Sequence, residues 1–162
     1  MKRLILLRHA KAERRSASGA DIDRALTEEG RGAAASVGHA LAAAGLIPDL
    51  ALISPTLRTR QTFEALGVNL PDVTLQITPA LYDAPAAVLR GAAESAEGDT
   101  ILVVAHNPGV GALALALVQA CIAAGVEERS ALEQGFPTAT AAAFEFVHGR
   151  TACLGVFRPA AV

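Results

Sequence analysis

The chain has 162 residues, a formal net charge of −2, and 52% hydrophobic residues, of which few are aromatic. This length fits one domain over residues 1–162 and suffices for a hydrophobic core without disulfides or structural metals. The near-neutral charge excludes a global attraction to nucleic acid or an acidic membrane, so we expect neither as a partner and expect any anion to meet a local cluster of cations.

The N-terminal part predicts a strand, a loop and a helix. Leu4 to Leu7 is a short apolar run, typical of a strand buried on both faces. The stretch from Ala10 to Ala25 is polar and aperiodic, which predicts a long loop. Thr27 predicts the N-cap of a helix that ends at Gly45.

The middle of the chain predicts two further strands, each followed by a helix. Leu50 to Ile53 is apolar and predicts the second strand. Ser54-Pro55 predicts the N-cap and first residue of a helix that runs to about Leu66. Val73 to Ile77 alternates like a third strand, and a helix is expected around Ala86 to Ala93.

The C-terminal part predicts a buried strand, a long helix and a hairpin. Thr100 to Ala105 predicts the fourth strand, and Pro108 opens a buried helix through about Ala124. The segment from Glu127 to Pro137 is predicted to be irregular. Ala141 to Val147 and Thr151 to Phe157 flank turn residues and predict an antiparallel hairpin.

This alternation of strands and helices predicts an α/β fold, a three-layer αβα sandwich. Its sheet is expected to be mostly parallel, with the C-terminal hairpin adding antiparallel pairing. The uncharged stretch from Ile101 to Gly125 is interrupted by His106-Asn107-Pro108-Gly109, which favours a buried strand and helix over a membrane span. Cys121 and Cys153 lie in apolar stretches and are expected to be buried free thiols in a cytoplasmic protein.

Cationic side chains and histidines follow the predicted strands. Arg8 and His9 follow the first, Arg58 lies one turn beyond the second, and His106 follows the fourth. Ligands of open α/β sheets bind beyond the carboxyl ends of the strands, so we expect these residues to converge. Arginine forks match phosphate oxygens, and neutral imidazole can act as a nucleophile. The pattern predicts a phosphate pocket that needs no metal or cofactor, since carboxylates do not cluster with the histidines.

Other matches to functional patterns are weaker. His39 lies in mid-helix and His148 in a turn, and both are expected to be surface residues. The segment Gly109-Val110-Gly111-Ala112-Leu113-Ala114 fits a dinucleotide-binding fingerprint, but His106-Asn107-Pro108 separates it from the preceding strand. We therefore do not expect a nicotinamide or flavin site.

The chain resembles the histidine phosphatase superfamily, also called phosphoglycerate mutase-like, and its SixA-like branch. Four segments carry this resemblance in the order in which the family has them, between Lys2 and about Leu117. They are Leu6-Leu7-Arg8-His9-Ala10, Asp23-Arg24-Ala25-Leu26-Thr27-Glu28-Glu29-Gly30, Ser54-Pro55-Thr56-Leu57-Arg58-Thr59-Arg60-Gln61-Thr62, and Val104-Ala105-His106-Asn107-Pro108. Ala10 stands where the family usually has Gly, and Ala25 where it has Pro.

The resemblance implies a phosphatase in which His9 forms a phosphohistidine intermediate that water hydrolyses. It also implies that Arg8, Arg58 and His106 bind the phosphoryl group and that Arg24 borders the pocket. The family's general acid is usually a Glu in a longer stretch, and here only Asp83 lies near that place. Asp83 is therefore the candidate acid, with the alternative that it caps the helix that follows.

The short stretch around Asp83 leaves little room for a lid over the pocket. An open pocket would admit a phosphorylated side chain of another protein, and a phosphohistidine leaves as imidazole with little help from an acid. These points favour protein phosphohistidine as the substrate. A small phosphoester substrate and a non-catalytic phosphate-binding module remain the alternatives, and the oligomeric state is left open.

Overall fold

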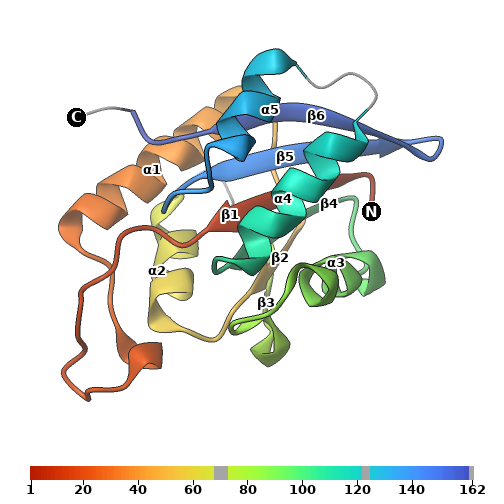
Figure 1. Cartoon of the computed structure of the whole chain (residues 1–162). Coiled ribbons are helices and arrows are strands. Elements are labelled where there is room, and N and C mark those ends of the chain that lie inside the picture. Colours follow the sequence, from red (N-terminus) through yellow and green to blue (C-terminus); the bar gives the residue numbers. More distant parts are fainter. Residues whose placement is uncertain (68–72, 122–124, 161–162) are drawn as a thin grey trace.

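The computed structural model describes residues 1–67, 73–121 and 125–160, which contain a six-stranded sheet (Figure 1). Its strands are β1 (Arg3–Arg8), β2 (Leu50–Ile53), β3 (Thr74–Ile77), β4 (Thr100–Ala105), β5 (Ala141–Val147) and β6 (Arg150–Phe157). Their order across the sheet is β3-β2-β4-β1-β5-β6. The first four pair in parallel, whereas β5 and β6 pair antiparallel. The predicted mostly parallel sheet with a C-terminal antiparallel hairpin is confirmed.

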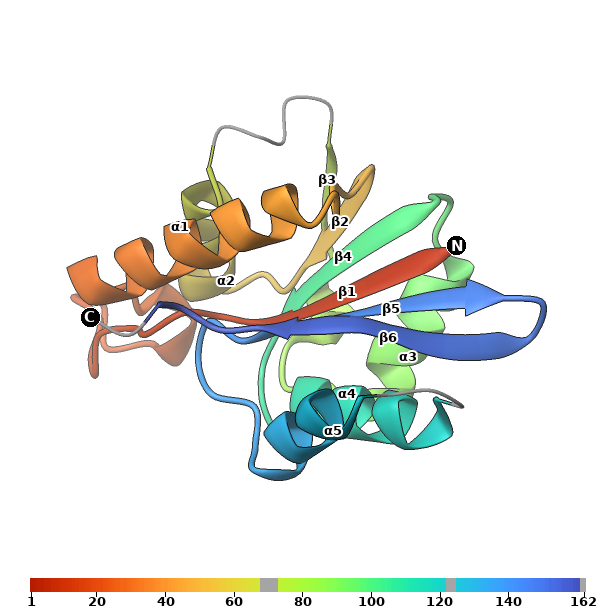
Figure 2. The same ribbon diagram turned by 90° about the horizontal axis from the view of Figure 1, so that it is seen from above.

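Helices cover both faces of this sheet. They are α1 (Glu28–Ala43), α2 (Leu57–Ala65), α3 (Ala86–Ser95), α4 (Gly109–Ala120) and α5 (Val126–Glu133), together with the 3-10 helices η1 (Asp21–Asp23) and η2 (Pro79–Leu81). Figure 2 shows α1 and α2 on one side of the sheet and α3, α4 and α5 on the other. This arrangement is the predicted three-layer αβα sandwich.

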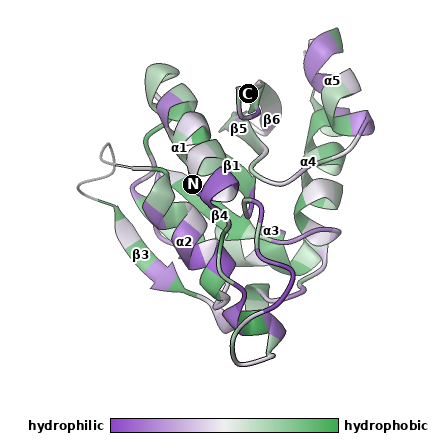
Figure 3. Cartoon of the chain, turned by 90° about the vertical axis from the view of Figure 1, so that its left-hand side faces the viewer, coloured by the Kyte–Doolittle hydropathy of each residue, from purple (hydrophilic) through white to green (hydrophobic). Residues whose placement is uncertain are grey.

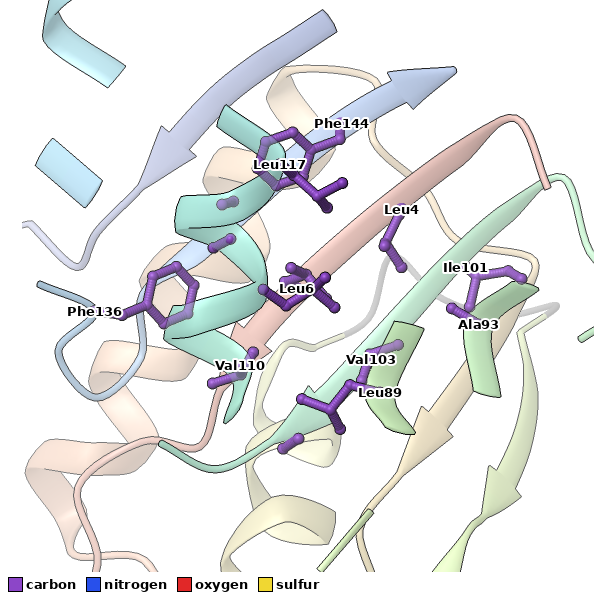
Figure 4. Packing of buried hydrophobic residues seen from close by; sticks show 14 of the residues in the cluster. Leu4, Leu6, Leu89, Ala93, Ile101, Val103, Val110, Leu117, Phe136 and Phe144 are labelled. Carbon is purple, nitrogen blue, oxygen red and sulfur yellow. The ribbon is translucent and has the colours of Figure 1, made fainter. Parts of the chain in front are cut away.

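The apolar run of β1 serves both faces, because successive side chains of a strand point in opposite directions. Leu4 and Leu6 belong to the core cluster beneath α3 and α4, as Figure 4 shows. Ile5 and Leu7 belong to the opposite cluster, which includes Val37 of α1. A strand buried on both faces fixes the height at which Arg8 and His9 leave the sheet.

Helix α4 packs closely because of its glycines. It is largely hydrophobic in Figure 3, whereas α2 and α5 show hydrophilic colouring. A Cβ at Gly109 would collide with the carbonyl oxygen of Ala84, and one at Gly111 would press on Asn107 and Phe136. These two glycines of the apparent dinucleotide fingerprint therefore allow a close approach of the helix to its neighbours.

Two predicted boundaries were wrong. Helix α2 begins at Leu57 with Thr56 as its N-cap, whose side chain accepts a hydrogen bond from the main-chain N of Thr59, so Ser54-Pro55 does not cap it. The segment predicted to be irregular from residue 127 contains α5, which buries Leu132 in the core. A short helix that buries so few side chains gives little periodicity.

Smaller differences concern element ends. Helix α4 ends at Ala120, and residues 122–124 of its predicted extension lie outside the described residues. The predicted loop from residue 10 to 25 includes η1, and Ala12 forms an isolated antiparallel bridge with Leu26. Thr27 is the N-cap of α1, as predicted, and its side chain accepts from the main-chain N of Gly30.

Two glycines of α1 provide a matched test of how this loop is held. A Cβ at Gly30 would collide with the carbonyl oxygen of Lys11, whereas one at Gly32 would meet nothing within 4 Å. We expect Gly30→Ala to lower the free energy of unfolding by about 1–3 kcal/mol, as overpacking does. Gly32→Ala should raise it by up to about 1 kcal/mol through helix propensity. Urea unfolding measures both, and equal effects of the two changes would contradict the close contact.

Candidate active site

The structure brings four of the predicted site residues together, and we call Arg8, His9, Arg58 and His106 the His9 cluster. Arg8 pairs with Ala105 across β1 and β4, and His9 and His106 follow these paired residues. The ring centroids of the two histidines are 5.2 Å apart. Arg58, in the first turn of α2, places Nη2 3.4 Å from Nδ1 of His106.

The His9 imidazole is buried and held in one tautomer. Its Nδ1 lies 2.8 Å from the carbonyl oxygen of Ala10, which can only accept, so Nδ1 carries the proton and Nε2 keeps its lone pair. Burial, together with the charges of Arg58 and Arg8, lowers the pKa of His9 to about 4 against the opposing effect of the Ala10 hydrogen bond. At neutral pH the ring is therefore uncharged with a free Nε2, the form that a nucleophile requires.

His106 is held between Ser54 and Arg58. Its Nε2 lies 2.7 Å from the hydroxyl of Ser54, and the Arg58 guanidinium donates toward its Nδ1. The proton is then on Nε2 and is donated to Ser54. Burial, followed by the neighbouring His9 and Arg58, lowers the pKa of His106 to about 3. Because a hydroxyl both donates and accepts, Ser54 can also support the tautomer in which Nδ1 donates to an anion.

Both arginines keep donors that no group in the described part of the protein uses. The Arg58 side chain is almost fully buried, and burial lowers the pKa of the Arg8 guanidinium. Arg8 donates from Nη1 to the carbonyl oxygen of Phe136 over 3.1 Å. Among the described residues, the buried Nε atoms of Arg8 and Arg58 have no hydrogen-bond partner. Such buried orphan donors point to an anionic ligand with several oxygens.

Asp21 completes the surroundings of the cluster, and the sequence reasoning missed it. Its Oδ2 accepts from Arg58 Nη2 over 2.9 Å and from the Tyr82 hydroxyl over 3.0 Å, and its Oδ1 accepts from Arg24 Nε over 2.8 Å. Its main-chain oxygen accepts from Arg58 Nη1 over 2.8 Å. Burial acts to raise the pKa of Asp21, but the hydrogen bonds from Tyr82, Arg58 and Arg24 outweigh it and lower the pKa to about 2.

The remaining candidates lie at the edge of the cluster. Arg24 is tied to Asp21 and donates to the carbonyl oxygen of Glu13, and its charge helps to lower the pKa of His9. Asp83 is exposed in the turn after η2 with a positive φ, and within the described residues its side chain has no hydrogen bond to the cluster. The cap of α3 is Pro85 without a side-chain bond, so the capping alternative for Asp83 was wrong. Its role as an acid stays a prediction.

Several further sequence expectations can be placed. His39 and His148 are exposed. Cys121 is buried, Cys153 is partly buried, and both are free. In the described ranges, no group of three or more His, Cys, Asp or Glu side chains is arranged to hold a metal ion. Helices long and apolar enough to cross a membrane are also lacking in that part of the chain.

Comparison with known families fits this geometry. Residues 4–86 match the sequence model of the histidine phosphatase superfamily (branch 1). The chain belongs to this superfamily. The matched range contains Arg8, His9 and Arg58, and membership in the superfamily supports phosphatase activity.

Solved structures share the fold along nearly the whole chain. A candidate phosphohistidine phosphatase SixA from Agrobacterium tumefaciens is 28% identical with a TM-score of 0.84, and the match covers 98% of each chain. One from Nakamurella multipartitia is 27% identical with a TM-score of 0.82, covering 99% of this chain and 97% of the other.

A curated sequence relative matches part of the chain. An uncharacterised chloroplastic protein of Arabidopsis thaliana is 31% identical over 121 residues, 67% of this chain and 55% of that protein. The chain thus spans about half the length of this curated relative.

The protonation of His9 can be tested directly. We expect its imidazole to titrate with a pKa of about 4 rather than 6.5, because burial and the arginines disfavour the charged ring. The unfolded chain then binds more protons between these values, so the free energy of unfolding should decrease as the pH falls from 6.5 toward 4. Imidazole NMR shifts, assigned by their loss in His9→Ala, measure the pKa. Titration near 6.5 would contradict the buried neutral ring.

Asp21 acts as an internal counter-charge for Arg58, which Asp21→Asn tests. The variant keeps the side-chain shape but leaves the Arg58 charge without its anion. We expect the free energy of unfolding to fall by about 1 kcal/mol, since Asp21 is half exposed, while vanadate should bind several-fold more tightly because it no longer competes with a carboxylate. Thermal unfolding and vanadate inhibition measure the two effects. Weaker vanadate binding with the fold intact would show that Asp21 positions Arg58 for the anion.

Proposed function

We propose that the chain is a phosphohistidine phosphatase for proteins, and that its reaction proceeds through phosphorylation of His9. The observation that carries this proposal is the free Nε2 of a neutral His9 beside the orphan donors of Arg8 and Arg58. A nucleophile and a set of oxyanion donors at one place are the two requirements of phosphoryl transfer through a covalent intermediate.

In the proposed mechanism, Nε2 of His9 attacks phosphorus while the bond to the leaving group breaks. Nδ1 keeps its proton and donates it in a hydrogen bond to the carbonyl oxygen of Ala10, which favours the positive charge that develops on the ring. Arg8 and Arg58 donate to the phosphoryl oxygens and carry their charge. His106 donates from Nδ1 once Ser54 supports that tautomer. Water then attacks the phosphohistidine and releases phosphate and neutral His9.

The surroundings of His9 favour a leaving group that needs little acid catalysis. Asp21, the carboxylate bonded to the cluster, has a pKa lowered to about 2 and accepts from three donors, so it is ionised and cannot supply a proton at neutral pH. Asp83 is exposed, and among the described residues it makes no hydrogen bond to the His9 cluster. An alkoxide requires protonation as it leaves, whereas the imidazole of a phosphohistidine departs readily. The similarity to proteins described as candidate phosphohistidine phosphatases also supports this substrate.

The proposal extends to location and to metals. Free thiols at Cys121 and Cys153 are typical of proteins in reducing compartments, which supports the cytoplasm. The arginines provide the positive charge that a metal supplies in other phosphatases, so we propose that the reaction needs no divalent cation. A small phosphoester is the second candidate substrate, and it requires an acid such as Asp83.

The decisive experiment compares a phosphohistidine protein with an aryl phosphate as substrates of the wild type and of His9→Ala. We expect the wild type to hydrolyse both, with phosphohistidine preferred, and His9→Ala to lose essentially all activity while it stays folded by circular dichroism. EDTA should leave the rate unchanged. Rapid quenching at alkaline pH, where phosphohistidine survives, should find the phosphate on His9.

Asp83→Asn serves as the control for substrate class. If Asp83 is the acid, the variant slows phosphoester cleavage far more than phosphohistidine cleavage. An equal effect on both removes it from the mechanism. Retained turnover in His9→Ala would refute the nucleophile, and binding of phosphate without turnover in the wild type would instead identify a phosphate-binding module.

A further inference from the structure

A hollow of about 340 Å³ lies beside the His9 cluster, and we call it the arginine hollow. Its walls come from the loop between β1 and α1, and they include Arg14, Arg15 and Arg24, together with Ser16, Ala20 and Asp21. The chain as a whole is slightly acidic, with a formal net charge of −2. Three guanidinium groups around one hollow are therefore a local feature of this loop.

The walls of the arginine hollow are held by hydrogen bonds. The Ser16 hydroxyl donates to the carbonyl oxygen of Ala20 over 2.7 Å, and the Ser18 hydroxyl donates to Asp23 over 2.7 Å. Arg24 donates to the carbonyl oxygen of Glu13 over 2.9 Å and spans the base of the loop. The loop thus offers a preformed surface, which lowers the entropic cost of binding.

The arginine hollow shares two residues with the surroundings of the cluster. Asp21 lines the hollow and also binds Arg58, while Arg24 lines the hollow and lowers the pKa of His9. A ligand that reaches from His9 into the hollow therefore passes the Asp21 and Arg24 side chains. A single substrate can occupy both places.

Of the three arginines of the hollow, Arg24 is paired with Asp21, whereas Arg14 and Arg15 have no ion pair in the described part of the chain. The Asp21 carboxylate is engaged by Arg58, Arg24 and Tyr82. Arg14 and Arg15 are exposed, and neither forms an ion pair among the described residues. Their planar forks match carboxylate and phosphate oxygens.

We propose that the arginine hollow binds acidic side chains that flank the phosphorylated residue of a protein substrate. This inference rests on the proposed function and extends it, because it states which phosphoproteins the enzyme prefers. Exposed, adjacent arginines suit the mobile carboxylates of an extended chain. A compact bisphosphate would instead bring a dianion, which favours more deeply buried donors such as those of Arg8 and Arg58.

Two phosphohistidine peptides test the proposal, one with glutamates and one with glutamines at the three positions on either side of the phosphorylated residue. Binding is measured on the His9→Ala background, where the peptides stay intact. Arg14→Gln/Arg15→Gln removes the two exposed guanidiniums, and Arg90→Gln/Arg150→Gln removes the same charge from α3 and the β5–β6 hairpin. We expect Arg14→Gln/Arg15→Gln to lower the affinity for the glutamate peptide about tenfold, which corresponds to the loss of two partly exposed charge pairs. The affinity for the glutamine peptide should stay unchanged.

The control variant Arg90→Gln/Arg150→Gln should leave the affinity for both peptides unchanged. In the otherwise wild-type enzyme, neither double substitution should alter kcat for an aryl phosphate. Equal binding of the two peptides, no binding of either, or equal losses in the two variant pairs overturns the proposal. If inorganic diphosphate binding depends on Arg14 and Arg15 but peptide binding does not, the proposal is overturned in favour of a small bisphosphate ligand. Failure of the proposed function is distinct, because the wild type would then hydrolyse neither peptide while the binding difference persisted.

Discussion

The parallel pairing of β1 with β4 is the constraint on which the site depends. Arg8 pairs with Ala105, and the main-chain N of His9 donates to the carbonyl oxygen of Ala105 over 3.1 Å. Both histidines therefore leave the sheet at the same level, one from each strand. Since β1 is buried on both faces, a slip in its register would expose core leucines, and the packing of the core thereby fixes the spacing of the two rings.

Burial then sets the chemistry of the groups that the sheet brings together. A dry environment disfavours a charged imidazole, so His9 keeps the lone pair that an exposed histidine would partly lose to protonation. The same environment makes each unpaired donor of Arg8 and Arg58 costly, and the cost falls when an oxyanion binds. The residues that would bind phosphate are thus destabilising in its absence, and Asp21 offsets part of that cost for Arg58.

Sequence reasoning succeeded where function follows from the ends of strands. Three of the four parallel strands, β1, β2 and β4, are apolar runs in the sequence. In an α/β sheet the residues after such runs share one edge, so the meeting of His9 with His106 could be anticipated. Sequence reasoning failed where a side chain can play either of two roles. Ser54-Pro55 is typical of a helix start, but the Ser54 hydroxyl binds His106 and Thr56 caps the helix.

Asp21 was missed for a different reason. It lies 37 residues from Arg58 and 61 from Tyr82 in sequence, in a loop without periodicity, and nothing local marks it. Only the folded loop, held at Gly30 against Lys11 and at Leu26 against Ala12, brings its carboxylate to Arg58. Contacts of this kind depend on tertiary structure alone.

The position of Asp21 would also explain how the two proposed anion sites stay selective while they lie side by side. At Arg58 an incoming anion competes with the Asp21 carboxylate that the protein already supplies. The net binding free energy is therefore the difference between the binding of the two anions to one guanidinium. A dianionic phosphoryl group binds Arg58 more strongly than a single carboxylate does, because it also accepts from the orphan Nε donors. An acidic side chain has no such advantage, because it would only replace one carboxylate with another. Arg14 and Arg15 have no ion pair among the described residues, so a carboxylate meets no such competition there. In the proposed function, Asp21 would thereby reserve the His9 cluster for the phosphoryl group and direct carboxylates toward the exposed arginines.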